Sequence, residues 1–269
     1  MNIVQAAIFG IIQGLAEMLP ISSSAHLVLF PWIFRFPDPG LAFDVALHVG
    51  TLVALVGYFW REWLDMAVSL VKLARERRVS SQSQKLALLL VIASVPGAIF
   101  GVLLGDYAES VFRSPLLVAS MLVVMGSVLW YADSRDTGAK KFDDINKSDS
   151  LKIGLAQALA IIPGVSRSGA TMTMGLLLGI DRSDAAKFSF MMSAPIIAGA
   201  ALVKVGDIST EMVTSVNFWV AMVAAIISSL FAIGFLLRFV RKHHFNVFVY
   251  YRFALAALVL VIYFGRKYV

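Results

Sequence analysis

The sequence predicts an all-α integral membrane protein made of six transmembrane helices plus two re-entrant helical hairpins, arranged as an inverted repeat. Three observations support this prediction. The composition is too apolar for a soluble domain, two apolar regions are interrupted by polar breaks, and these two regions resemble each other. Irregular backbone at membrane depth is tolerated only where it is buried in protein or lines a cavity. We therefore expect the two breaks to form a polar site inside the membrane.

The composition sets the class of protein. Of the 269 residues, 59% are hydrophobic and 15% are charged, with a mean hydropathy of +0.82. A soluble domain is about half apolar and about a quarter charged. The absence of cysteine excludes disulfides, thiol catalysis and Cys-ligated metals. The net charge of +6 is typical of cytoplasmic loops and of attraction to anionic lipid, so we expect membrane lipid rather than nucleic acid as the partner.

Six stretches are long and apolar enough to cross a membrane, which takes about 20 residues. Tilting allows small shifts at their ends. In chain order they are Phe43–Trp60, Leu86–Gly105, Pro115–Ala132, Phe188–Val205, Phe218–Leu237 and Val247–Gly265.

Two further apolar regions are each divided by a polar break. Ile3–Leu19 runs into a Pro-Ile-Ser-Ser-Ser-Ala-His segment and then a shorter apolar run, Leu27–Phe34. Ile153–Ile180 has the same plan and is broken at Pro163 and Gly164. Pairs of half-length helices around a polar break are typical of re-entrant hairpins.

These two regions align without a gap at an offset of 144 residues. Gly10–Ala16 falls on Gly154–Ala160, and Ser22–Ala25 falls on Ser166–Gly169. The offset is close to half the chain, which predicts a tandem duplication with halves at about 1–135 and 146–269. The polar segment 133–152 would link the halves within a single polytopic membrane domain, 1–269.

The distribution of Lys and Arg predicts the orientation. If each hairpin returns to its side of entry and the six spans alternate, sixteen basic residues lie on one side and five on the other. The positive-inside rule makes the first side cytoplasmic, and the two halves are then inverted. The first side holds Arg61, Lys72, Arg75, Arg77, Arg78, Lys85, Arg135, Lys140, Lys141, Lys147, Lys152, Arg182, Lys187, Arg238, Arg241 and Lys242; the second holds Arg35, Arg113, Lys204, Arg266 and Lys267.

The second break, Pro163–Thr171, predicts a phosphate site. An arginine at membrane depth is costly unless it faces a partner or a water-filled cavity. Arg167 stands among the hydroxyls of Ser166, Ser168 and Thr171, where a helix can begin with free N–H groups. Such donors together with a guanidinium bind phosphate. The alternative is a Gly/Pro kink packed on another helix, with Arg167 reaching a lipid headgroup.

The first break offers the groups that a phosphoryl transfer also needs, a nucleophile and a group that handles protons or holds a metal. Ser23 and His26 lie on one helix face, as do Gln13 and Glu17. Ser23 with His26 is a candidate nucleophile–base pair, and Glu17 could orient the imidazole or bind a divalent ion. The nucleophile could also be His26, or a water with His26 and Glu17 as acid/base partners.

Other features add detail to the site. Ser22 and Ser24 would add phosphate donors, and His48 either lines the site or makes an interhelical hydrogen bond. No HExxH, Walker A or Rossmann pattern is present, so zinc proteolysis, ATP hydrolysis and dinucleotide binding lack support.

The segment Gln13–His26 resembles the first signature of the undecaprenyl-pyrophosphate phosphatase family, also called the bacitracin resistance protein family. That signature is E/Q-x-x-x-E-x-x-P-V/I-S-S-S/T-G/A-H. Pro163–Thr171 resembles the second motif, PGxSRSxxT, and Arg252 after two tyrosines resembles a C-terminal Tyr-Arg element. The resemblance covers essentially the whole chain.

The resemblance implies a hydrolase of the plasma (inner) membrane of a prokaryote, multi-pass, that converts undecaprenyl pyrophosphate to the monophosphate carrier used for cell-wall glycans. It implies site roles by motif match and a divalent cation, Mg or Ca. Many members carry Glu where this chain has Gln13, whose carbonyl can still bind such an ion beside Glu17. A homodimer is a possible assembly. The matched site residues are Glu17, Ser22, Ser23, His26, Ser166, Arg167, Ser168 and Thr171.

A transporter or flippase of a phosphorylated polyprenyl lipid is the alternative from another class, because inverted repeats with broken helices are a transporter plan. It would need the phosphate cradle but no Ser/His/Glu set.

Overall fold

The computed structural model describes residues 1–36, 40–76, 79–109, 111–204, 206 and 209–267, and within them it contains helices but no strand. Arg77 and Arg78 of the predicted cytoplasmic set, and Val205 at the end of a predicted span, lie outside this part. The helices are α1 (Ile3–Met18), α2 (Ser23–Phe34), α3 (Leu41–Tyr58), α4 (Trp60–Glu76), α5 (Gln82–Glu109), η1 (Val111–Arg113), α6 (Pro115–Ser134), η2 (Phe142–Asp144), α7 (Lys147–Ala158), η3 (Leu159–Ile161), α8 (Arg167–Leu177), α9 (Arg182–Lys204), α10 (Thr210–Thr214), α11 (Val216–Phe239) and α12 (Asn246–Lys267).

Each predicted span falls on a helix. In the described part, α5, α6, α9, α11 and α12 are long and apolar enough to cross a membrane, and a sixth span results if α3 and α4 count as one. These two helices meet at an angle of 80° beside Phe59, so the span predicted to end at Trp60 ends with α3. The chain is therefore an all-helical, multi-pass membrane protein.

Both predicted breaks lie between two helices, and proline explains where the helical backbone before each break ends. Pro20 follows the end of α1, and Pro163 follows the short 3-10 helix η3 that continues α7. A residue before proline is pushed out of the α conformation. Leu19, before Pro20, has φ −76° and ψ 147°, and Ile162, before Pro163, has φ −82° and ψ 117°. The chain then turns and starts α2 and α8.

The starts of α2 and α8 share an uncommon geometry at the 144-residue offset. Their N-cap residues, Ser22 and Ser166, have positive φ angles of 75° and 72°. The Ser22 hydroxyl accepts a hydrogen bond from the Ala25 N–H, and the Ser166 hydroxyl accepts one from the Gly169 N–H. Serine is a preferred N-cap because its oxygen satisfies a free helix donor.

Close helix contacts also recur at this offset. α1 packs along α11, whereas α7 packs along α5. A Cβ atom added to Gly10 would lie 2.1 Å from the Ala221 carbonyl oxygen, and one added to Gly154 would lie 2.4 Å from that of Ala93. Small residues let helix backbones approach in membranes, so these glycines set how near the hairpins lie to the long helices.

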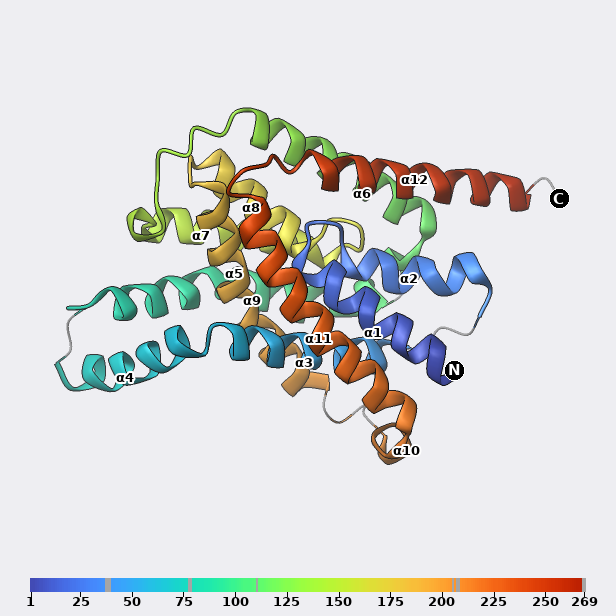
Figure 1. The fold of residues 1–269 in the computed structure, drawn as a ribbon, viewed down its shortest axis with the longest axis horizontal. Helices are drawn as coiled ribbons and strands as arrows, with labels where there is room; N and C mark the ends of the chain where they lie inside the picture. The colour runs from blue at the N-terminus through green and yellow to red at the C-terminus, as the bar shows by residue number, and fades with distance from the viewer. Residues whose placement is uncertain (37–39, 77–78, 110, 205, 207–208, 268–269) are drawn as a thin grey trace.

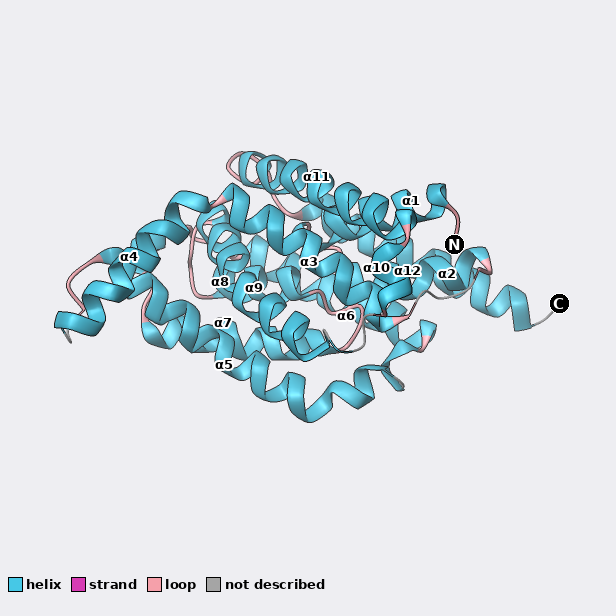
Figure 2. Ribbon diagram, turned by 90° about the horizontal axis from the view of Figure 1, so that it is seen from below, coloured by secondary structure: helices cyan, strands magenta, loops and turns pink. Residues whose placement is uncertain are grey.

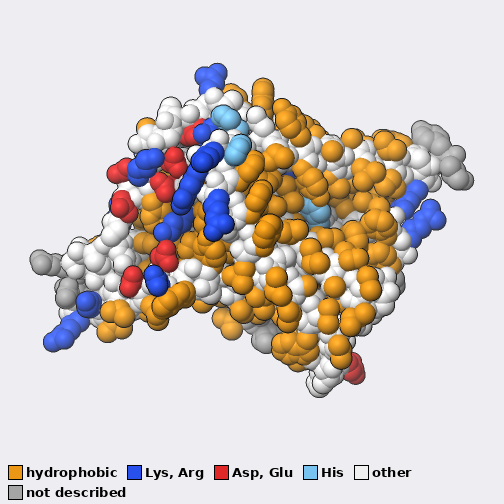
Figure 3. Space-filling view, viewed as in Figure 1, with side chains coloured by type: hydrophobic (Ala, Val, Ile, Leu, Met, Phe, Trp, Pro, Cys, Tyr) orange, Lys and Arg blue, Asp and Glu red, His pale blue; other side chains and the backbone are white. Residues whose placement is uncertain are grey.

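The helices lie around the two hairpins, with α6 beside α12 and both chain ends at the same end of the molecule (Figures 1 and 2). Between α6 and α7 the chain pairs with the end of α8, where Lys140 N–H donates to the Gly179 carbonyl at 2.8 Å. Apolar side chains cover the middle of the molecule, and most Lys and Arg side chains on the visible face gather near the end of α11 (Figure 3).

Candidate active site between the two hairpins

Glu17, in the last turn of α1, is the centre of the polar site. It is 6% exposed. One carboxylate oxygen, Oε2, accepts hydrogen bonds from the Ser23 hydroxyl at 2.5 Å and from Gln13 Nε2 at 3.1 Å. His48 Nε2 lies 3.2 Å from the same oxygen. The other oxygen, Oε1, pairs with Arg167 Nη2. The carboxylate therefore joins both hairpins to α3.

Arg167 is the first residue of α8 and brings a cation to this carboxylate. Its Nη2 atom donates to Glu17, while its Nη1 atom is buried and has no hydrogen-bond partner within the described residues. A buried donor without a partner costs about 1–3 kcal/mol. The fork geometry of a guanidinium lets it bind one anion with Nη2 and another with Nη1. Arg167 thus has a donor available for a second, incoming anion.

His48 lies beside Glu17, so it lines the polar cluster and also connects α3 with α1. Its Nδ1 atom lies 2.7 Å from the Asp44 carbonyl oxygen and its Nε2 atom 3.2 Å from the Glu17 carboxylate. The carbonyl oxygen only accepts, so Nδ1 is the ring nitrogen that donates to Asp44, and Nε2 is the one that faces Glu17. The Glu17 carboxylate thus faces the Arg167 guanidinium on one oxygen and the His48 ring on the other.

The N-termini of α2 and α8 meet beside this cluster. Gly164 N–H donates to the Ser22 hydroxyl at 3.2 Å, and the Ser168 hydroxyl donates to the Leu19 carbonyl at 3.1 Å. The first N–H groups of a helix have no partner within it, and they favour anions. Within the described part, the N–H groups of Ser23 and Arg167 make no backbone hydrogen bond. Two helix starts therefore offer free donors at one place.

The His26 ring does not join the hydrogen bonds of the Ser23, Glu17 and Arg167 side chains. His26 Nδ1 lies 2.7 Å from the Ser22 carbonyl oxygen, and its Nε2 lies 2.6 Å from the Tyr251 hydroxyl. The two rings stack with centroids 5.6 Å apart. Ser23 instead donates to Glu17. The predicted Ser23–His26 pair is therefore not formed in this structure, because the first hairpin turns Ser23 toward α1 and His26 toward α12.

The remaining predicted hydroxyls have partners of their own. Ser22 Oγ and Ser24 Oγ lie 3.2 Å apart, and Ser166 Oγ and Ser168 Oγ lie 3.3 Å apart. The Thr171 hydroxyl donates back toward the Arg167 carbonyl at 2.9 Å, and lies 2.6 Å from Ser189 Oγ in α9. It is 1% exposed. Thr171 thus connects α8 to α9 behind the site.

Arg252 of α12 holds the two breaks together, a role that the sequence did not predict. It is fully buried. Its Nη1 atom donates to the Pro20 carbonyl at 3.2 Å, and its Nη2 atom donates to the Gly164 carbonyl at 2.7 Å. These carbonyls are 144 residues apart. Three more backbone carbonyls, of Met121, Leu122 and Val165, also accept from this guanidinium. The sequence indicated Arg252 through its match to the Tyr-Arg element and through its place inside an apolar run, but not what it binds.

Comparisons with known proteins agree with the motifs at this site. The family model described as bacitracin resistance protein BacA matches residues 6–258. Proteins named undecaprenyl-diphosphatase are similar over nearly their whole length. The one from Moorella thermoacetica is 50% identical over 99% of this chain and 100% of its own, and the one from Gemmatimonas aurantiaca is 49% identical over 96% and 97%. The one from Pelotomaculum thermopropionicum is 46% identical over 100% and 99%. This chain belongs to the bacitracin resistance protein BacA family.

Proposed function

We infer that this protein removes the terminal phosphate of undecaprenyl pyrophosphate in a bacterial membrane and leaves undecaprenyl phosphate, the carrier that cell-wall glycan synthesis reuses. The names of its relatives and the multi-pass fold agree with this activity. The observation that carries the chemistry is the 2.5 Å contact between the Ser23 hydroxyl and a Glu17 carboxylate whose other oxygen holds Arg167.

In the proposed reaction, Ser23 Oγ attacks the terminal phosphorus while Glu17 Oε2 takes the hydroxyl proton. A new Oγ–P bond forms, the bond from phosphorus to the bridging oxygen breaks, and undecaprenyl phosphate leaves. Water then attacks the phosphorus of the phosphoserine and the Oγ–P bond breaks. Glu17 returns its proton to Ser23 Oγ, inorganic phosphate is released and both side chains are restored. A positioned carboxylate that accepts the proton contributes typically about 10²- to 10⁴-fold to such a step.

Arg167 and the helix starts would hold the diphosphate. The unpartnered Nη1 atom of Arg167 and the N–H groups at the starts of α2 and α8 supply the donors. Donors fixed before the reaction stabilise charge as it develops on the transferred phosphoryl group. Ser22 and Ser166 orient these donors through their N-cap contacts, and the hydroxyls of Ser24 and Ser168 lie beside the two cap hydroxyls. Thr171 supports α8 from behind.

His26 keeps the alternative assignments open, either as nucleophile or as the base for a water. Its Nδ1 atom faces the Ser22 carbonyl, so Nε2 is the nitrogen that would react once the Tyr251 hydroxyl moves away. Rapid quenching with substrate labelled on the terminal phosphate distinguishes the cases. A label stable to acid and lost with Ser23→Ala supports Ser23. An acid-labile label lost with His26→Asn would assign the nucleophile to His26, and no label would favour water.

A divalent cation, Mg or Ca, is part of the proposal, and the oxygens present fit it in kind. Gln13 Oε1 is a buried oxygen without a partner in the described part, next to Glu17. Such ions are often held by one or two protein oxygens plus substrate phosphates. Gln13 and Glu17 would hold the ion, which would offset charge on the diphosphate. Arg167 and His48 already occupy Glu17, so the substrate phosphates must supply most of the ligands.

We also propose the finer topology, with six spans, two re-entrant hairpins and inverted halves. Its support is the matching N-caps at Ser22 and Ser166, and the matching close contacts at Gly10 and Gly154. The positive-inside count makes the basic end cytoplasmic. Because the chain has no cysteine, a single Cys at Ser23 labelled from either face would reveal the leaflet to which the site opens. Cross-linking in membranes would test the predicted homodimer.

Phosphate release from undecaprenyl pyrophosphate by the purified protein tests the function. Ser23→Ala should abolish release, and Ser120→Ala, an exposed serine on α6 that bonds only its own helix, should not. The names of the relatives do not favour the transporter alternative. Lipid movement in proteoliposomes without phosphate release would restore that alternative and overturn ours.

A further inference from the structure

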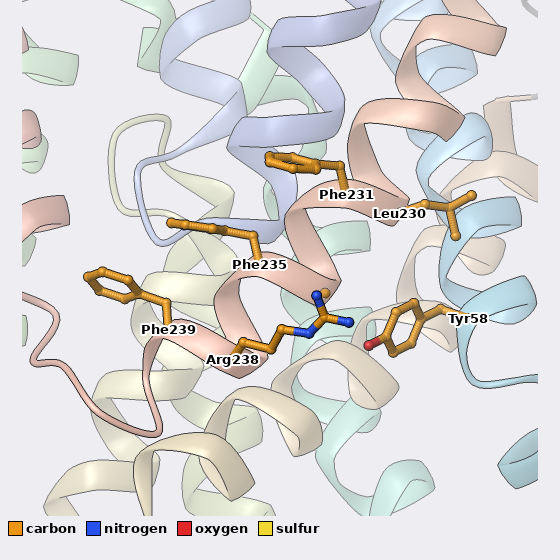
Figure 4. Close-up of a pocket in the computed structure, with 7 residues that line it drawn as sticks. Tyr58, Leu230, Phe231, Phe235, Arg238 and Phe239 are labelled. Carbon is orange, nitrogen blue, oxygen red and sulfur yellow. The ribbon is translucent and has the colours of Figure 1, made fainter.

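A groove on the outer face of α11 is separate from the hairpin site. Its volume is about 480 Å³, and it is lined by one face of α11 and the end of α3 (Figure 4). The lining residues are Tyr58, Leu230, Phe231, Gly234, Phe235, Arg238 and Phe239. None of them contacts Glu17, Ser23 or Arg167 by a hydrogen bond or an ion pair.

The apolar part of the groove is a row of aromatic rings. Phe231 and Phe235 stack with centroids 6.1 Å apart, and Phe235 and Phe239 stack at 5.4 Å. Phe231 is 67% exposed and Phe235 41%. The row is about 12 Å long at 1.5 Å per residue. Exposed rings on a membrane-spanning helix lie against lipid chains, so the row fits an alkyl chain that runs along α11.

The polar end of the groove has two donors. The Arg238 guanidinium extends toward the Tyr58 ring, whose hydroxyl lies at the same end (Figure 4). Within the described part, neither side chain has a hydrogen bond, and Arg238 has no carboxylate partner. An unpaired guanidinium and a phenol hydroxyl at the head of an apolar groove match a phosphate group attached to an alkyl chain.

We propose that this groove binds an anionic phospholipid of the surrounding membrane. Arg238 and Tyr58 hold the headgroup phosphate, and one acyl chain lies along Phe231 and Phe235. Charge complementarity identifies the occupant, because a zwitterionic lipid brings its own cation to the headgroup while an anionic lipid does not.

A simpler role for Arg238 is a favourable charge at the C-terminal turn of α11. Arg241 carries the same charge two residues past the end of α11, is exposed and does not line the groove. The two arginines are therefore a matched pair. If the groove binds lipid, replacing Arg238 should weaken lipid binding more than replacing Arg241. If only the positive charge at this end matters, the two replacements should have equal effects.

Native mass spectrometry of the purified full chain, with defined lipid added to detergent, tests the proposal. We expect phosphatidylglycerol to be retained over phosphatidylcholine, and we expect Arg238→Gln to weaken that retention about tenfold. Phe235→Ala should also weaken it, while Arg241→Gln should leave it unchanged. Thermal unfolding without added lipid should match among these exposed variants, which confirms that each is folded.

Other outcomes would overturn the proposal. Equal losses in Arg238→Gln and Arg241→Gln would mean a general charge effect. Displacement of the lipid by millimolar inorganic phosphate, or retention of undecaprenyl phosphate alone, would assign the site to a free anion or to the reaction product. Disulfide-linked dimers of Phe235→Cys in membranes would show that a second copy covers the groove. Phosphate release by Arg238→Gln is a separate assay, so failure of this proposal leaves the proposed function intact.

Discussion

Arg167 pairs with Glu17 across 150 residues of sequence, and this ion pair joins the two hairpins at the centre of the molecule. Each partner is the reason the other can be buried at membrane depth, since an unpaired charge there is costly. Serine and glutamine donors complete the shell of the carboxylate, while one nitrogen of the guanidinium stays unpartnered. The pair therefore organises the nucleophile and the phosphate donor together.

Arg167→Lys should lower turnover by about 10²- to 10³-fold, because an ammonium keeps the charge but loses the planar fork. Lysine can still pair with Glu17, so thermal stability should change less than turnover. The measurement is kcat for phosphate release with saturating undecaprenyl pyrophosphate. Near-normal turnover of Arg167→Lys would contradict the proposed role of the Arg167 guanidinium in phosphate binding.

Glu17→Gln should lower kcat by about 10²- to 10⁴-fold, because the amide keeps a hydrogen bond to Ser23 but cannot take its proton. The amount of trapped phosphoenzyme should fall in proportion. Ser120→Ala serves as the control, since Ser120 is exposed on α6 and bonds only its own helix. A Glu17→Gln enzyme that still forms phosphoenzyme at the normal rate would exclude Glu17 as the base.

The sequence predicted the positions of the helices and breaks well because prolines, glycines and apolar runs act locally. Pro20 and Pro163 end helices through their own rings, wherever the rest of the chain lies. It also predicted that the two breaks come together, because polar groups at membrane depth need partners. That expectation is met by the contact between Gly164 and Ser22.

The pairing of side chains inside the site could not be predicted in the same way. Helical spacing placed Ser23 and His26 on one face of a helix. Two side chains three residues apart can still point toward different neighbouring helices. The tertiary positions of α1 and α12 decide that Ser23 meets Glu17 and His26 meets Tyr251. The role of Arg252 depends on the path of five backbone carbonyls, which side-chain patterns do not encode.

Arg252→Met should destabilise the protein by at least about 3 kcal/mol, because it leaves several buried carbonyls without a donor. Activity should fall as well, since the carbonyls of Pro20 and Gly164 lose their common anchor. Thermal unfolding in detergent measures the first effect. Arg135→Met is the control, since Arg135 is exposed and stacks only on Tyr131. If both variants unfold at the same temperature, Arg252 does not hold the breaks together.

Gly10→Ala and Gly154→Ala should each destabilise the protein by about 1–3 kcal/mol, because the added methyl group would press on the backbone of a facing helix. The facing carbonyls are those of Ala221 and Ala93. Gly101→Ala should be neutral or slightly stabilising, as its added Cβ meets nothing within 4 Å. Similar shifts in unfolding temperature for the first two variants would support equivalent hairpin packing. A neutral Gly154→Ala would contradict it.

Gln13→Glu should tighten the dependence of activity on Mg²⁺ or Ca²⁺ by about tenfold. It places a second carboxylate beside Glu17, and affinity for such ions rises with the number of charged ligands. In the native chain a neutral amide oxygen stands at this position, so a chelator should reduce phosphate release at moderate concentrations. Titration of the metal-free protein with each ion measures the effect. Gln157→Glu is the control: Gln157 is the counterpart of Gln13 in the second hairpin, but it has no acidic neighbour in the described contacts. Full activity of both the native chain and Gln13→Glu in the presence of a chelator would contradict a role for the cation. Arg167 and the helix starts would then provide all of the charge stabilisation.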